Sequence, residues 1–254
     1  MFSSTANSRL LALVLPAAVL AAAGTALVPL EQRIRTAAGA TGLATAQLRA
    51  LTGQGGTLAV LGGWRSAVAS GFWLKADLAW ESRDAAGTLA AIGLTVAADA
   101  RPLGFWLNGA RMIAYDLPEW LPGDAPTAVR QRVREEYARR ALEFLARGLH
   151  WHGPDAALHI EMANIHLRRR GDLEAAARCY RLAAETPGAP CYAARIHAEM
   201  LRALGRPEEA LQWLRQVLPS LPVGDPAAAR DVVGARIAEL EREVDDRHGG
   251  AIPP

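Results

Sequence analysis

The stretch GDLEAAARCYRLA at residues 171–183 returns 34 residues later as GRPEEALQWLRQV at residues 205–217. The matched positions are Gly171 and Gly205, Ala176 and Ala210, Tyr180 and Leu214, and Ala183 and Val217. A period of this length is typical of stacked pairs of helices. The repeat therefore predicts an all-α chain in which each copy is one helix, a turn and a second helix.

Residues upstream of each glycine complete the two helix pairs. In both copies, apolar and small residues fall on one helical stripe before the glycine and on a second stripe after it. The first stripe holds Ile160, Ala163, Asn164 and Leu167 in one copy, and Ala194, His197, Ala198 and Leu201 in the other. Small residues allow two helix axes to approach closely. We predict two regular repeats over residues 155–222, which end near Pro219 and Pro222.

The sequence resembles the tetratricopeptide repeat (TPR) family. Both follow the same order of small residues, a glycine turn, an aromatic residue or leucine, and a closing proline. The resemblance implies an α-solenoid of helix hairpins whose first helices line a concave groove for protein partners. The groove positions that it implies are Leu158, Glu161, Ile165, Arg168, Tyr192, Arg195, Glu199 and Arg202. The members of the family that clamp a terminal carboxylate carry Lys, Asn and Arg there, from which Glu161 and Ile165 depart. An ordinary solvated surface is the alternative for all eight residues.

Residues 64–154 read as degenerate repeats of the same kind. The segment LGGWRSAVASGFWLKADLAW at residues 61–80 resembles the start of the periplasm-facing region of bacterial membrane-anchored TPR proteins. We expect a small face at Ala67, Ala69, Ser70 and Gly71, and a core stripe at Trp73, Ala76 and Trp80. Further helices are expected at 89–100, at 104–115 and, after a proline-rich insert at 116–126, from a cap at Thr127 to Gly153. The stripe of that last helix is Val129, Val133, Tyr137, Ala141, Leu145 and Gly148.

A capping helix is predicted in residues 223–254. Asp225 precedes Pro226 as an N-cap would. The apolar face is Val233, Ile237, Leu240 and Val244, and the opposite, charged face is Arg236, Glu239, Arg242 and Glu243. One apolar and one charged face suit a helix that closes the core of a solenoid to water.

The amino end contains 21 uncharged residues, LLALVLPAAVLAAAGTALVPL at residues 10–30, which is long enough for one membrane crossing. We favour an uncleaved signal anchor over residues 1–30, because the apolar run continues past the small residues at Ala21 and Ala23. Cleavage after Ala23, which would release a secreted protein, is the alternative. The short amino tail carries Arg9 and no acid, which predicts a periplasmic body on the inner membrane. A juxtamembrane helix at 31–51 and a glycine-rich joint complete residues 31–63.

No motif for chemistry is found. The net charge is +2, which does not suggest nucleic-acid binding. His150 and His152 flank a tryptophan, and His159 and His166 are seven residues apart, a spacing unlike that of helical metal sites. Cys179 and Cys191 are expected to lie too far apart for a disulfide and to serve as packing residues. We expect no enzyme activity, cofactor, metal or small-molecule substrate.

The sequence therefore predicts a membrane-anchored TPR scaffold that binds envelope proteins. The rival interpretation is a permanent subunit of a larger membrane complex, docked through the aromatic helices around Trp64, Phe72 and Trp73.

Overall fold

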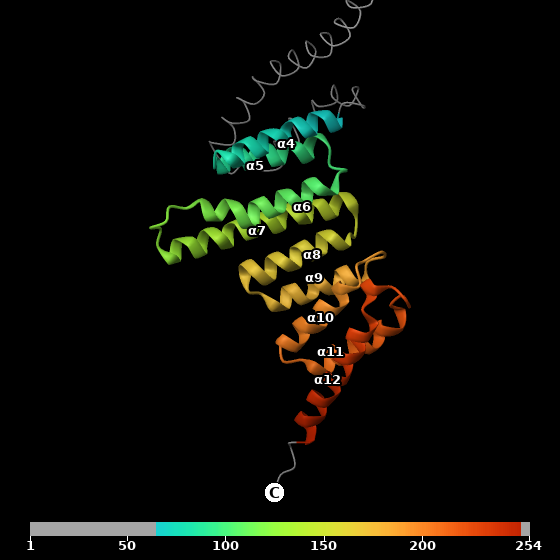
Figure 1. Ribbon diagram of the computed structural model, residues 1–254. Helices are drawn as coiled ribbons and strands as arrows, with labels where there is room; N and C mark the ends of the chain where they lie inside the picture. The colour runs from blue at the N-terminus through green and yellow to red at the C-terminus, as the bar shows by residue number, and fades with distance from the viewer. Residues whose placement is uncertain (1–64, 250–254) are drawn as a thin grey trace, which may run out of the picture. The chain divides into compact units, whose positions relative to one another are not determined.

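The computed structural model of the chain describes residues 65–249, and every regular element within this range is a helix (Figure 1). The α-helices are α4 (Arg65–Glu81), α5 (Ala85–Ala98), α6 (Leu103–Arg111), α7 (Thr127–His152), α8 (Ala156–Ile165), α9 (Leu173–Glu185), α10 (Tyr192–Ala203), α11 (Pro207–Val217) and α12 (Arg230–Gly249). None of the helices in the described range is long and apolar enough to span a membrane. The predicted anchor at 10–30, the helix at 31–51 and the glycine-rich joint lie outside the described residues.

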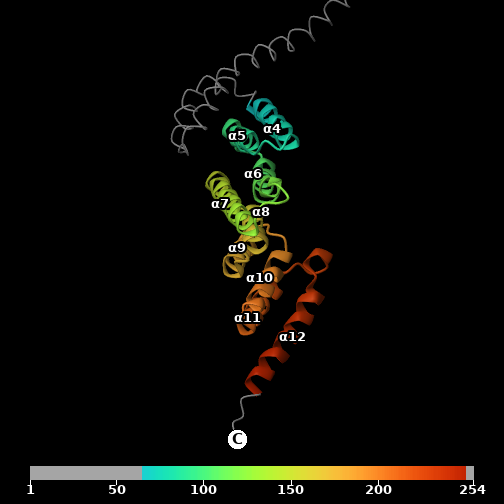
Figure 2. The ribbon, with the colours of Figure 1, turned by 90° about the vertical axis from the view of Figure 1, so that its left-hand side faces the viewer.

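Consecutive helices form antiparallel pairs, each of which packs on the next pair. The pairs are α4 with α5, α6 with α7, α8 with α9, and α10 with α11. Neighbouring pairs meet through α5 and α6, α7 and α8, and α9 and α10 (Figure 1). Helix α12 then packs on α11, after the chain has passed through the short 3-10 turns Leu218–Ser220 and Pro226–Ala228 (Figure 2). The all-α prediction is thus confirmed for the described part of the chain.

The two regular repeats contain the predicted helices. Gly171 and Gly205 both have left-handed backbone conformations, with φ of 64° and 76°, where a side chain would be strained. Asp172 then caps α9, because its carboxylate accepts a hydrogen bond from the backbone N–H of Ala175 at 2.9 Å. The last turn of the first helix in this copy is a π-helical turn, His166–Arg170. A matching π turn, Met112–Asp116, follows α6.

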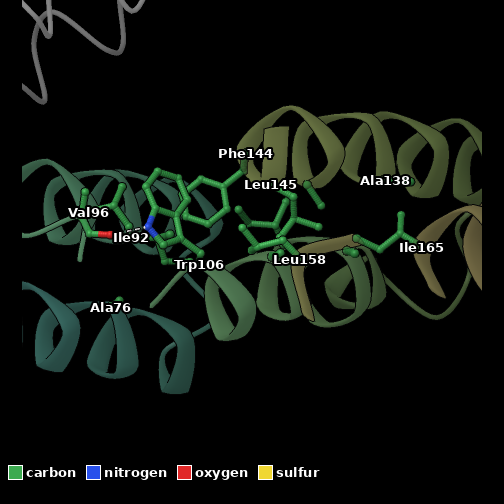
Figure 3. Close-up of a cluster of buried hydrophobic side chains, with 14 of the residues drawn as sticks. Ala76, Ile92, Val96, Trp106, Ala138, Phe144, Leu145, Leu158 and Ile165 are labelled. Carbon is green, nitrogen blue, oxygen red and sulfur yellow. Dashed lines mark hydrogen bonds between the residues drawn. The ribbon is translucent and has the colours of Figure 1, made fainter. Parts of the chain in front are cut away.

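Trp106 is the largest fully buried side chain of the core that the first three pairs share (Figure 3). It is 1% exposed, and its ring lies 4.8 Å from that of Phe144, centroid to centroid. Its indole Nε1 donates a hydrogen bond to the carbonyl of Ala100 at 2.7 Å. Leu158 of α8 packs into the same cluster, so this core holds three helix pairs together.

Gly109 of α6 lies tightly packed between Ile92 of α5 and Phe144 of α7. A Cβ atom there would lie 2.9 Å from Cγ2 of Ile92 and 3.1 Å from Cε1 of Phe144. We expect Gly109→Ala to lower the free energy of unfolding by about 1 kcal/mol, since the strain of overpacking exceeds the gain in helix propensity. Gly93, inside α5, has no atom within 4 Å of the corresponding position. Gly93→Ala should therefore raise the free energy of unfolding by roughly 0.5–1 kcal/mol. Urea denaturation followed by circular dichroism measures both, and equal effects would contradict the packing.

Three predicted helix starts differ from the structure. Helix α5 begins at Ala85, four residues before the predicted start, because Asp84 caps it through the N–H of Gly87. Thr127 is not the cap of α7: the cap position is Pro126, and no side chain caps this helix. Asp225 caps only the 3-10 turn at Pro226–Ala228, and α12 begins later, at Arg230.

The predicted packing of α4 is partly wrong. Of the four small residues expected to face a helix, only Ala69 is buried, whereas Ala67, Ser70 and Gly71 are exposed. On the aromatic stripe, Ala76 is fully buried and Trp73 stacks on Phe105, with ring centroids 5.3 Å apart. Trp80 is 40% exposed, and its Nε1 donates to a carboxylate oxygen of Asp116 at 3.0 Å.

Candidate protein-binding groove

The first helices of the last three pairs, together with α12, line two pockets. The pocket between α6 and α8, of about 350 Å³, is also bordered by the loop before α10. The pocket between α10 and α12 has a volume of about 320 Å³. Tyr192, at the start of α10, lines both of them and is 41% exposed. We call the surface formed by these two pockets the groove.

The α6–α8 pocket is organised by one ion pair. Nε of Arg111 donates to Oε2 of Glu161 at 2.9 Å. The Glu161 side chain is only 4% exposed, whereas that of Arg111 is 55% exposed. Nearby, Asp155 caps α8 through the N–H of Leu158 at 3.0 Å. The pair joins two helix pairs across the wall of the pocket, and it presents a guanidinium group to solvent.

The α10–α12 pocket has apolar walls and a charged rim. Its apolar lining residues are Ile196, Leu214, Val232 and Val233. At the rim, Nε of Arg236 on α12 lies 2.7 Å from Oε1 of Glu199 on α10. Arg195 also lines this pocket, and its buried Nε has no hydrogen-bond acceptor among the described residues.

Tyr180 is buried and Tyr115 is partly buried, and neither of them lines a pocket. The hydroxyl of Tyr180 donates to Oδ1 of Asn164 at 2.8 Å. Burial raises the pKa of Tyr180, and burial and the charge of Glu161 raise that of Tyr115. Both phenols therefore remain protonated at neutral pH and act as hydrogen-bonding groups, not as bases.

Four of the eight predicted groove residues line the pockets. They are Glu161, Tyr192, Arg195 and Glu199. Leu158 and Ile165 are each 0% exposed in the hydrophobic core, so the prediction that they face a partner is corrected. Arg168 and Arg202 line neither pocket, and Arg202 instead donates to Glu243 of α12 at 2.9 Å. Whether the remaining residues bind a protein stays a prediction.

Sequence reasoning missed several lining residues. Six residues line the pockets although they were not predicted to do so: Leu107, Arg111, Ile160, Ile196, Val232 and Arg236. The sequence of α6 could have indicated two of them, since Leu107 and Arg111 are four residues apart and therefore lie on the same face of the helix. Val232 and Arg236 line a pocket only because α12 packs beside α10, and the sequence of α12 alone does not predict that packing.

The charged face predicted for α12 is only partly exposed to solvent. Arg236 forms an ion pair with Glu199, and Glu243 forms one with Arg202, so both residues join α12 to α10. The apolar face is as predicted, with Val233 and Leu240 each 1% exposed.

Groups capable of chemistry do not gather in the groove. No cluster of His, Cys, Asp and Glu within residues 65–249 could hold a metal ion. Cys179 and Cys191 are free, as predicted, and burial raises the pKa of Cys179. Nε2 of His152 lies 3.1 Å from the carbonyl oxygen of Ala100. These side chains act in packing and in local hydrogen bonding.

Three histidines make the stability depend on pH. Burial lowers the pKa of His159, His166 and His197 below the ordinary value of 6.5. His197 is 5% exposed, and its Nδ1 lies 2.9 Å from the carbonyl oxygen of Ala177. Between the folded and unfolded pKa values, the unfolded chain binds protons that the folded chain does not. Stability is therefore complete above the unfolded pKa and falls as the pH drops below about 6.5.

We expect the free energy of unfolding, measured in urea at pH 7.5, 6.5 and 5.5, to decrease over this range. Each histidine contributes at most about 1.4 kcal/mol per pH unit. His197→Gln should reduce the slope, because it removes one of the three imidazoles whose pKa is lowered by burial. A stability that does not change with pH would contradict the burial of these rings.

Comparison with known proteins gave no match. No protein-family model, no curated protein and no solved structure matched this chain.

Proposed function

We propose that the chain is a TPR-type α-solenoid that binds a protein partner in the groove and acts as a scaffold for envelope complexes. The 34-residue period, with left-handed glycines at both matched turns, supports the repeat class. The apolar run at residues 10–30 supports attachment to the inner membrane, with a periplasmic body. Tethering to a membrane raises the effective concentration of partners in the same membrane. No cofactor or catalysis forms part of this proposal.

The observation that carries the proposal is the arrangement of the two pockets along the first helices of successive pairs, with Tyr192 between them. Exposed aromatic residues beside apolar pockets are typical anchors of protein interfaces. Two ion pairs, Arg111 with Glu161 and Arg236 with Glu199, lie at the pockets, and they suit a polar rim beside the apolar walls of the α10–α12 pocket.

A photo-crosslinker at the groove tests this function. The residue p-benzoylphenylalanine would replace Tyr192 in the full-length protein in its native cells, and irradiation should link it to a partner. The matched control places the same group at Leu182, which is 48% exposed on α9 and lines neither pocket. Adducts at position 192 but not at 182 support groove binding. Identical adducts at both positions, or none at 192, would overturn it.

Topology is tested separately. Protease added to spheroplasts should digest a carboxy-terminal tag on the full-length protein if the body is periplasmic. Mass spectrometry of the amino-terminal peptide distinguishes the intact anchor from the secreted form that cleavage after Ala23 would produce. A protected tag would overturn the periplasmic placement.

A permanent subunit is the second candidate, because α4 exposes apolar side chains. Leu74 is 60% exposed, Leu78 57% and Trp80 40%. The residues that the sequence suggested for this docking face fit it less well: Trp73 packs on Phe105, Phe72 is half-buried, and Trp64 lies outside the described residues. A partner that co-purifies at constant stoichiometry, and is lost with Leu74→Asp but kept with groove variants, would favour a subunit.

A further inference from the structure

The α10–α12 pocket is shaped for an apolar side chain. Its walls come from the apolar residues of three helices, α10, α11 and α12. Val232, at its edge, is 50% exposed, so apolar surface reaches from the pocket to the solvent. A volume of about 320 Å³ is within the range of protein pockets that enclose a compact apolar group.

The charges at this pocket do not cancel. Glu199 pairs with Arg236 at 2.7 Å, and Arg236 also pairs at 2.6 Å with Glu239, which does not line the pocket. Arg195 has no ion-pair partner among the described residues, and its buried Nε has no acceptor there. A buried donor without an acceptor is costly, and a carboxylate is the strongest acceptor for a guanidinium group. The remaining charge at the pocket is therefore positive.

We propose that the α10–α12 pocket binds an acidic segment of a protein partner, in which an apolar side chain enters the pocket and a neighbouring Asp or Glu pairs with Arg195. This inference rests on the proposed function and names the chemistry of the partner. The apolar residue supplies affinity by burial, and the carboxylate fixes the direction and register of the segment. A basic segment would be repelled by Arg195, because Glu199 is already paired with Arg236.

Selection from a random peptide library tests this chemistry. A phage-displayed library of twelve-residue random peptides would be selected on the full-length protein in detergent micelles. We expect enriched peptides to contain a large apolar residue within about three positions of Asp or Glu. Synthetic copies should lose roughly tenfold or more in affinity for Arg195→Glu. Replacing their acid by Lys should restore binding to that variant.

Two further variants separate a specific effect from a loss of folding. Arg178→Glu makes the same charge change at an exposed position on α9 that lines neither pocket, and it should leave affinity unchanged. Val232→Asp, at a half-exposed wall, should remove the preference for an apolar residue. Circular dichroism of each variant verifies that the helices are intact.

Three outcomes would overturn the inference. The enriched peptides could contain no acidic residue, the Arg195→Glu variant could keep the same preference for acidic peptides, or no peptide could be enriched over the empty support. If position 192 still forms adducts with a partner, only the chemistry proposed here fails and the groove function stands. If position 192 forms no adducts, the function itself fails.

Discussion

Trp106→Ala should lower the free energy of unfolding by about 3–5 kcal/mol, because Trp106 is the largest fully buried side chain among the described residues. The ring is 1% exposed and packs against Phe144, and it fills the space next to Gly148. Its removal leaves a cavity where three helix pairs meet and removes the hydrogen bond from the indole Nε1 to the carbonyl of Ala100. Urea denaturation of the full-length protein in micelles, followed by circular dichroism, measures the change.

The matched control is Trp151→Ala on α7. Trp151 is 68% exposed, so its truncation should alter the free energy of unfolding by less than about 0.5 kcal/mol. If the two tryptophan variants were equally stable, Trp106 could not be the centre of the core.

Arg111→Met should cost about 2–4 kcal/mol, because it leaves the carboxylate of Glu161 buried without its cation. The side chain of Glu161 is 4% exposed and accepts the Nε hydrogen bond of Arg111 at 2.9 Å. The double variant Arg111→Met with Glu161→Met should recover most of the loss, since an apolar pair needs no compensation. The double-mutant cycle gives the coupling energy of the two residues directly.

Arg134→Met provides the control for this pair. Arg134 and Glu119 also form a salt bridge, at 2.8 Å, but their side chains are 43% and 39% exposed. Breaking an exposed pair should cost no more than about 1 kcal/mol. A loss at Arg134 as large as that at Arg111 would mean that burial does not decide the effect.

Within residues 65–249, the sequence was sufficient to predict the helices, because their signals are local. Gly171 and Gly205 occupy the left-handed turns that the repeat pattern required, and the apolar stripe of α12 is buried at Val233 and Leu240. Helix starts were predicted less well. Thr127 is a common capping residue type, but it is the first residue of α7 and caps nothing.

The groove was only half predictable, because it depends on packing between pairs. Leu158 and Tyr192 occupy matching positions 34 residues apart, yet Leu158 is buried against Trp106 and Gly148, whereas Tyr192 is exposed. Arg168 lies in the π turn His166–Arg170. One extra residue in that turn rotates the following side chains away from the 3.6-residue phase. The 34-residue pattern predicts neither the burial of Leu158 nor the π turn at Arg168.

Tyr192 forms a common wall of two pockets, so a movement of its ring would change the shape of both, and occupants of the two pockets would then depend on each other. A ring that tilts toward α8 takes space from one pocket and gives it to the other. Ligands that prefer opposite positions of this ring would compete without touching each other, whereas ligands that prefer the same position would bind cooperatively. A single aromatic side chain can therefore couple two recognition events on neighbouring repeats.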